Sequence, residues 1–213
     1  VQDTVAPVAS TQDITVQLDA SGSASIVPSD VDNGSSDACD FSLSLDIDSF
    51  DCSDVGSNTV TLTVTDVNNN SSTARATVTV EDNVLPVITL LSSNSIVECD
   101  GSGNALDLQS WLDSNGGASA TDACGPLTWS HDYTDGSMSD LCGATGSVNV
   151  TFTVTDANNN STTTTSTFTI VDTTAPDLFI PPSYEADCSD ELVLFDALAS
   201  DDCSDVILTL SED

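Results

Sequence analysis

The chain has 213 residues, of which 35 are Asp or Glu and only one, Arg75, is Lys or Arg, so its formal net charge is -34. A single cation cannot form the basic surface that nucleic acids require, and an anionic membrane would repel the chain. Charge of one sign at this density strains a compact fold unless cations or salt screen it, so the composition predicts a dependence on cations.

Apolar and polar residues alternate along the chain, which predicts β-strands. The runs are, in order, Ile14, Val16, Leu18 and Ala20, then Phe41, Leu43, Leu45 and Ile47, then Val60, Leu62 and Val64. Helix is expected to be nearly absent, apart from a short turn around Ala105 to Leu112. Strands with one apolar and one solvated face pack as two antiparallel sheets. We therefore expect an all-β fold of immunoglobulin-like β-sandwiches in tandem.

Internal repetition sets the expected domain organisation. The segment Thr59 to Thr73 recurs as Asn149 to Thr163, and three proline openings, at Pro7, Pro86 and Pro176, follow one another in the same order. The spacing of roughly 80 to 90 residues matches an immunoglobulin-like sandwich. These landmarks predict repeat 1 at residues 1–82, repeat 2 at 83–172 and an incomplete repeat 3 at 173–213.

Two turns place oxygen-bearing side chains at alternate positions, as a loop around a calcium ion does. Their residues are Asp66, Asn68 and Asn70 in the first turn and Asp156, Asn158 and Asn160 in the second. The alternative is a polar hairpin turn, which Asn and Asp form without any metal. The pattern alone leaves both interpretations open.

A second acidic group lies at each junction between repeats, shortly before the proline. Its members are Asp3, then Glu81, Asp82 and Asn83, and then Asp172. A cation bound at a junction would neutralise these carboxylates and stiffen the linker. With this group added, we expect calcium to be a structural cofactor of the chain.

The seven cysteines form no Cys-x-x-Cys pair, and with one histidine there is no zinc constellation, so disulfides in an oxidising compartment are expected. Cys39 with Cys52, and Cys124 with Cys142, occupy equivalent places and would close short loops. An alternative pairs Cys99 with Cys124 and Cys188 with Cys203. The sequence does not choose between them.

Catalytic groups are scarce. His131 is the only histidine, and it has neither a repeated counterpart nor a recognisable nucleophile nearby. Carboxylates are so numerous that no pair stands out as a glycosidase dyad. We expect no enzymatic activity.

Four phrases carry a family resemblance: Gln17 to Ala24, Asp32 to Cys39, Val64 to Asn70 and Val78 to Asp82. They resemble hyalin-repeat (HYR-like) modules of large secreted proteins from Bacteroidetes-type bacteria. The junction Glu81 to Pro86 is also similar to the calcium-binding linker of cadherins. The chain departs from the bacterial pattern with Asn69 and Asn159 where glycine is usual in the turn, and with Ala74 where a cysteine often follows.

The resemblance implies tandem immunoglobulin-like modules with attachment or structural roles, at the bacterial cell surface or outside the cell. It also marks Thr4 and Thr173 as positions for O-linked glycans. Expected partners are the neighbouring repeats of the same chain, further copies of the chain, and surface glycans or proteins, with no direct membrane insertion.

The leading hypothesis is thus a non-catalytic, calcium-rigidified repeat segment of a large bacterial surface or filament protein. One alternative is the accessory repeat region of a secreted hydrolase. Another is the subunit of an extracellular filament in which a neighbouring chain donates the strands that complete repeat 3.

Overall fold

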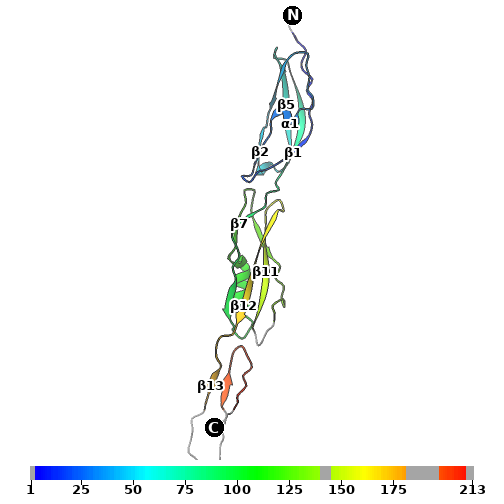
Figure 1. Cartoon of the computed structure of the whole chain (residues 1–213). Helices are drawn as coiled ribbons and strands as arrows, with labels where there is room; N and C mark the ends of the chain where they lie inside the picture. The colour runs from blue at the N-terminus through cyan, green and yellow to red at the C-terminus, as the bar shows by residue number, and fades with distance from the viewer. Residues whose placement is uncertain (1–2, 140–144, 181–196, 210–213) are drawn as a thin grey trace, which may run out of the picture. The chain divides into compact units, whose positions relative to one another are not determined.

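The structure, a computed structural model, describes residues 3–139, 145–180 and 197–209 (Figure 1). Its contacts divide the chain into two compact units. Unit 1 comprises Val1–Ile88, Ala120–Thr128 and Val154–Thr162, and unit 2 comprises Thr89–Ser119, Trp129–Thr153 and Thr163–Asp213. The division into three repeats stays a prediction.

Strands dominate the described residues, which confirms the all-β fold class. In the first part of the chain these are β1 (Ile14–Gln17), β2 (Ser23–Ser25), β3 (Phe41–Leu45), β4 (Ser49–Asp51), β5 (Gly56–Asp66) and β6 (Ser71–Glu81). They are followed by β7 (Val87–Leu90), β8 (Ser95–Glu98), β9 (Ser119–Thr121), β10 (Thr128–His131), β11 (Gly146–Thr155), β12 (Ser161–Val171), β13 (Asp177–Phe179) and β14 (Leu198–Ser200). The short helices are α1 (Pro28–Val31), η1 (Cys52–Asp54), α2 (Ala105–Asp113) and η2 (Asn115–Gly117).

Unit 1 is built on a four-stranded sheet in the order β1-β6-β5-β3, with β2 and β4 forming a separate pair. The long β5–β6 hairpin is antiparallel, as expected, and pairs Thr65 with Ser71 next to its turn. β1, however, joins β6 in parallel, with Ile14 opposite Val78. Alternation within a strand carries no information about its neighbour's direction, so the sequence could not predict this parallel pairing.

The core of unit 1 follows from the alternation of β5 and β6. Val60, Leu62 and Val64 of β5 are fully buried, while the Thr residues between them are partly exposed. From β6, Val78 and Val80 complete the same apolar layer. Burying each such side chain stabilises the fold by about 1.5–3 kcal/mol.

Unit 2 contains most of the second four-stranded sheet, in the order β10-β11-β12-β8. β8 joins β12 in parallel, with Ser95 opposite Phe168, so β8 occupies the place that β1 has in unit 1. The core here is aromatic: Phe152 of β11 and Phe168 of β12 are fully buried. Trp111 of α2 packs against both rings, with centroids 5.2 and 5.5 Å away.

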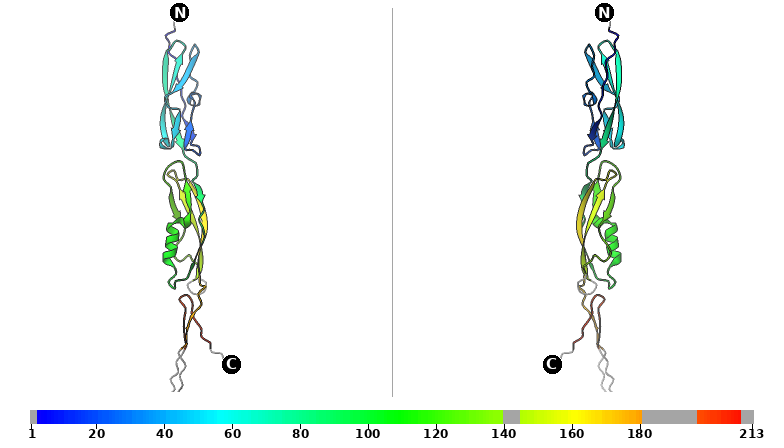
Figure 2. Two further views of the ribbon diagram at one scale, coloured as in Figure 1. Left: turned by 90° about the vertical axis from the view of Figure 1, so that its left-hand side faces the viewer. Right: turned by 90° about the vertical axis from the view of Figure 1, so that its right-hand side faces the viewer.

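Helix α2 covers the core of unit 2, and Figure 2 shows it beside the strands of that unit. Its buried residues Leu108, Trp111 and Leu112 have the three-to-four-residue spacing of one helix face. The Trp111 indole also donates a hydrogen bond to the Ser93 carbonyl, at 3.0 Å. The short turn expected near Ala105 is therefore confirmed in place, but it is a helix of nine residues. No helix among the described residues has the length and apolar character needed to cross a bilayer.

β13 and β14 form an antiparallel pair in unit 2 that leaves apolar side chains uncovered. Leu178, Phe179 and Leu198 are 56%, 62% and 64% exposed. Large apolar side chains exposed together mark a surface that a further element can cover. The predicted repeat 3 starts here, and most of its early part, residues 181–196, lies outside the described residues.

Candidate functional site: a repeated acidic junction

The turn between β5 and β6 is closed by its own aspartate. One oxygen of Asp66 accepts hydrogen bonds from the amides of Asn68 and Asn70, both at 2.8 Å, and the other accepts one from the Asn70 side chain at 2.8 Å. Burial of Asp66 works to raise the pKa of its carboxyl. The hydrogen bonds from Asn70 and Asn68 outweigh burial and lower that pKa below its ordinary value. The turn thus holds its shape through hydrogen bonds within it.

The turn between β11 and β12 repeats this geometry. Asp156 accepts from the amides of Asn158 and Asn160 at 2.8 Å and from the Asn160 side chain at 2.9 Å. Both aspartates are buried, with Asp66 4% and Asp156 6% exposed. Metal binding at these two turns stays a prediction, and the hydrogen bonds agree with the polar-hairpin interpretation.

A second aspartate begins each junction, four residues before its proline, and forms a hydrogen bond with the backbone that follows it. Its carboxylate accepts a hydrogen bond from the backbone amide two residues later. This bond occurs in three places: Asp3 accepts from Val5 at 3.0 Å, Asp82 from Val84 at 3.0 Å, and Asp172 from Thr174 at 3.3 Å. Two of these aspartates, Asp3 and Asp82, also accept hydrogen bonds from the long hairpin turns. The Asn70 side chain donates to the Asp3 carbonyl at 3.2 Å, and the Asn160 side chain donates to the Asp82 carbonyl at 3.0 Å.

A third aspartate precedes a cysteine by two residues, and it too recurs three times. The cysteine amide donates to its carboxylate in the pairs Cys39 and Asp37 at 2.7 Å, Cys124 and Asp122 at 2.7 Å, and Cys203 and Asp201 at 2.8 Å. We call this arrangement the Asp-x-Cys motif. The same local hydrogen bond gives each cysteine the same position relative to its aspartate.

The junction aspartates and the Asp-x-Cys motifs come together as three clusters. Their members are Asp3, Asp37 and Cys39 in the first, Asp82, Asp122 and Cys124 in the second, and Asp172, Asp201 and Cys203 in the third. In each cluster one ligand atom per residue lies within 4.8 Å of the others. The first two clusters belong to unit 1 and the third to unit 2. Carboxylate oxygens are ligands that calcium prefers.

The second cluster is the most enclosed. Asp82 is only 5% exposed, and its second oxygen accepts from the Asn158 side chain at 2.8 Å. One carboxylate oxygen of Asp122, Oδ2, is buried without any hydrogen-bond partner. A buried carboxylate oxygen is costly unless a proton or a cation compensates it. This orphan oxygen, on a residue that clusters with Asp82, is the feature that fits a bound cation.

In the first cluster the cysteine is a thiol. Cys39 donates a hydrogen bond to Asp3 Oδ2 at 3.4 Å and is the only free cysteine among the described residues. The hydrogen bond to Asp3 raises the pKa of the Cys39 thiol, and burial and the charges of Asp3, Asp37 and Asp66 raise it further.

The structure corrects the predicted disulfides. Cys52 bonds to Cys124, and Cys99 bonds to Cys203, so neither Cys39–Cys52 nor the alternative Cys99–Cys124 forms. Cys142 and Cys188 lie outside the described residues, but their predicted partners Cys124 and Cys203 are bonded elsewhere. The prediction paired cysteines within a repeat, whereas each bond joins a cysteine of one predicted repeat to the Asp-x-Cys motif of the next.

A glycine closely approaches each of the two Asp-x-Cys motifs that form disulfides. Gly22 has φ +76°, and a Cβ there would lie 2.6 Å from Cys52 Sγ and 3.2 Å from Cys124 Sγ. Gly101, with φ +72°, would place a Cβ 2.6 Å from the Asp202 carbonyl oxygen. Gly22 follows β1 and Gly101 follows β8, so a glycine turn abuts the Asp-x-Cys motif in both places.

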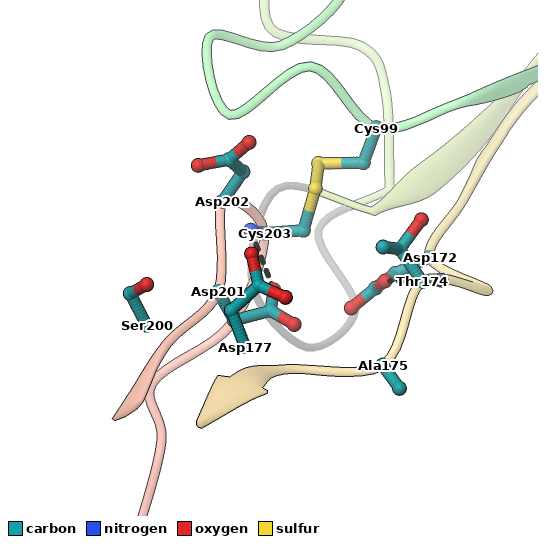
Figure 3. A pocket seen from close by; sticks show the side chains of 9 residues that line it. All are labelled: Cys99, Asp172, Thr174, Ala175, Asp177, Ser200, Asp201, Asp202 and Cys203. Atoms are coloured by element: carbon teal, nitrogen blue, oxygen red, sulfur yellow. Dashed lines mark hydrogen bonds between the residues drawn. A yellow bond between two sulfur atoms is a disulfide. The ribbon is translucent and has the colours of Figure 1, made fainter. Parts of the chain in front are cut away.

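The third cluster lines an open pocket of about 100 Å³ in unit 2 (Figure 3). Asp172, Asp177 and Asp201 line it beside the Cys99–Cys203 disulfide, and Asp202 completes its acidic lining. Cys99 and Cys203 carry no thiol, so carboxylates are the groups here that suit a hard cation.

The junction after β12 is also fixed by Glu98, at the end of β8. Its carboxylate accepts from the amide and hydroxyl of Thr173 at 2.7 and 2.8 Å, and from those of Thr174 at 3.0 and 2.9 Å. The bond from the Thr173 amide is the largest of the influences that lower the pKa of Glu98 below its ordinary value. A glycan on Thr173 would have to replace its hydroxyl hydrogen bond, while Thr4 is exposed. Glycosylation of both stays a prediction.

Two predicted metal ligands lie apart from the clusters. Glu81 accepts from the Gln17 side chain at 2.7 Å, and the Asn83 side chain donates to Gln17 Oε1 at 2.5 Å. Both are exposed, whereas Asp82 between them is buried. Because side chains alternate along an extended segment, only the middle member faces the cluster.

Sequence reasoning missed Asp37, Asp122 and Asp201 as candidate ligands. The acidic-cysteine stretch was visible as a recurring landmark, and that recurrence was the available signal. It could not show that the stretch meets the junction aspartate, which lies 34 to 40 positions away in two of the repeats and 29 in the third. His131 lies exposed on β10, its ring 6.3 Å from that of Phe152.

Comparisons with known proteins found no matching family model and no matching curated protein. Among solved structures, Drosophila N-cadherin EC1-4 has a TM-score of 0.40 and 11% identity, covering 79% of this chain and 50% of its own. Mouse cadherin-23 EC22-24 has a TM-score of 0.35 and 10% identity, and the match covers 81% of this chain and 69% of that structure. Human mucin-like protocadherin EC1-2 has a TM-score of 0.34 and 14% identity, and the match covers 76% of this chain and 96% of that structure. This chain spans half of the N-cadherin fragment. Identities and scores this low show neither the family nor the function of this chain.

Proposed function

We propose that this chain is a non-catalytic, extracellular repeat segment of a large bacterial surface or filament protein, with calcium stiffening the junctions between repeats. The observation that carries the proposal is the second acidic cluster, where Asp82 is buried and the Oδ2 atom of Asp122 has no partner. The first and third clusters repeat its layout, as a structural role in every junction requires.

The ligands proposed for the second cluster are the carboxylates of Asp82 and Asp122 and the side chain of Asn158. Asn158 now donates its amide nitrogen to Asp82. A half-turn of that amide group would present its oxygen at the same place. Cys124 Sγ belongs to the disulfide and is not proposed as a ligand. The corresponding carboxylates are Asp3 and Asp37 in the first cluster and Asp172 and Asp201 in the third.

Calcium would stabilise the fold in two ways. It would satisfy the buried oxygen of Asp122, and it would reduce the repulsion between clustered carboxylates in a chain of charge -34. Because an ion bound only by the folded state shifts the unfolding equilibrium, its effect can be read from the melting temperature.

The test is calorimetric melting of chelator-treated protein as calcium is added back at constant ionic strength. At calcium concentrations about 100-fold above the dissociation constant we expect a rise on the order of 5–10 °C. The Asp122→Asn variant should lose part of that rise, whereas the control Asp48→Asn, which removes an equal charge from an exposed position, should keep it. An unchanged melting temperature in the wild type would refute the structural role of calcium.

The filament alternative has one observation in its favour, the exposed apolar side chains of β13 and β14. A strand donated by a neighbouring chain would cover them. Electron micrographs of native material that show a helical fibre, with strands crossing between chains, would favour this role over a single-chain stalk.

A further inference from the structure

The three Asp-x-Cys motifs have one local geometry but two chemical states. Cys124 and Cys203 are buried and bonded to Cys52 and Cys99, whereas Cys39 is half-buried and carries a free thiol. The hydrogen bond from the cysteine amide to the preceding aspartate has the same length, within 0.1 Å, in all three motifs. In this backbone hydrogen bond the Cys39 motif matches the two that form disulfides.

The cysteines that complete the two bonds do not occupy equivalent positions. Cys52 lies in η1, after β4, whereas Cys99 directly follows β8, the counterpart of β1. What the two bonds share is the receiving motif and the glycine turn beside it. Gly22 approaches Ala123 and Cys124, and Gly101 approaches Asp202.

Among the described residues, no glycine turn lies against the Cys39 motif. The Cys39 thiol is hydrogen-bonded to Asp3, which belongs to its own cluster. In the other two motifs the place next to the central residue, Ala123 or Asp202, is filled by a glycine turn. The corresponding place beside Ala38 is the surface on which a partner would dock.

We propose that Cys39 is the receiving half of a further disulfide, whose other cysteine is presented beside a glycine turn by the end of another repeat of this kind. The bond would join that repeat to this chain as Cys52–Cys124 and Cys99–Cys203 join the predicted repeats within it. This covalent connection goes beyond the proposed function and does not depend on calcium.

The chemistry is an oxidation with a defined acceptor. The thiols of Cys39 and of the partner cysteine give up two protons and two electrons to a disulfide oxidant, such as oxidised glutathione or a disulfide oxidoreductase. The oxidant is reduced to two thiols, and the sulfur–sulfur bond forms between the two repeats. The other repeat comes either from the same polypeptide or from a second copy of the chain, and both sources supply the same chemistry.

The test maps the disulfides of protein isolated from its native source. Free thiols are alkylated with iodoacetamide without reduction, and the protein is cleaved at aspartate and aromatic residues, because Arg75 is the only tryptic site within these 213 residues. We expect almost complete protection of Cys39 and a cross-linked peptide that joins it to a cysteine near a glycine in another repeat. Non-reducing electrophoresis separates the sources: a second copy at least doubles the mass until dithiothreitol is added, and a repeat in the same polypeptide does not.

Three results would overturn the proposal: alkylation of Cys39 in most molecules, a bond to glutathione alone, or a bond to Cys142 or Cys188 in a molecule of monomer mass. The control is Cys39→Ser, which should lose the cross-link while Cys52–Cys124 and Cys99–Cys203 still map as before. Loss of all three together would indicate misfolding, and the wild-type map then decides alone.

Discussion

Asn69 and Asn159 occupy the tightest point of the two long hairpins, with φ of 66° and 71°. Among residues other than glycine, asparagine tolerates this left-handed conformation best. Beside the bacterial pattern that the sequence resembles, an asparagine in place of glycine looks like a departure. In the structure, asparagine adopts at both positions the left-handed conformation that glycine would provide, so the turns of the two long hairpins are preserved.

Replacing Asn69 separates the contribution of the backbone from that of the side chain. The Asn69→Ala variant should lose about 1–2 kcal/mol of unfolding free energy, because a Cβ without a compensating polar group is strained at positive φ. The control Asn69→Gly should stay close to the wild type. Urea unfolding monitored by circular dichroism measures both, and equal midpoints for the two variants would contradict the strain argument.

Residue identities predicted the three junction aspartates but not their partners. Asp3, Asp82 and Asp172 were recognised because each precedes a proline in the same way. The cysteine pairs could not be predicted because Cys52 and Cys99 hold different positions in their repeats, and the two bonds share only the Asp-x-Cys motif to which each is joined. Alignment of cysteines by order therefore paired the wrong ones.

At the scale of single elements, helix α2 is the clearest insertion into the strand pattern. It contributes Trp111, which is 9% exposed and lies edge-on to Phe152. The sequence predicted the helix and β1, β3 and β5, because apolar spacing is a local property. It did not predict that β1 and β8 pair in parallel with β6 and β12, since pairing depends on residues more than 60 positions away.

Trp111 should therefore anchor α2 to the sheet of unit 2. Trp111→Ala removes a buried aromatic ring and the hydrogen bond to Ser93, and should cost about 3–5 kcal/mol of unfolding free energy. Leu106→Ala on the same helix is the matched control, because Leu106 is 87% exposed and its loss should change stability by less than about 0.5 kcal/mol. Chemical denaturation measures both, and similar losses would show that α2 does not depend on this anchor.

At the scale of the whole molecule, repulsion among 35 carboxylates opposes folding and only Arg75 offsets it. Salt shortens the range of this repulsion, from a Debye length of about 30 Å at 0.01 M to about 3 Å at 1 M. The composition predicts that the stability of the fold depends on cations, but it could not identify which carboxylates are buried together. Asp82 and Asp122 converge only after the chain has folded.

Sodium chloride should therefore raise the melting temperature of chelator-treated protein over this range. The variant Asp48→Lys, which reverses one exposed charge, should melt higher than the wild type at 0.01 M, and the difference should shrink at 1 M as screening removes it. Differential scanning fluorimetry at fixed pH follows both. A melting temperature that falls with salt, or an effect of Asp48→Lys that persists at 1 M, would show that net repulsion does not limit stability.

The parallel pairing of β1 with β6 and of β8 with β12 has a mechanical consequence. The chain enters through the first strand of each pair and leaves through the last, and parallel neighbours have their entry and exit at opposite ends. Once the disulfides are reduced, tension along the polypeptide therefore pulls the two strands past each other and loads the backbone hydrogen bonds between them together, not one after another. While Cys52–Cys124 and Cys99–Cys203 are intact, β6 and β12 lie within the loops that they close, and the covalent bonds carry the load instead. A tether built from such pairs resists stretching far better than one whose terminal strands peel apart.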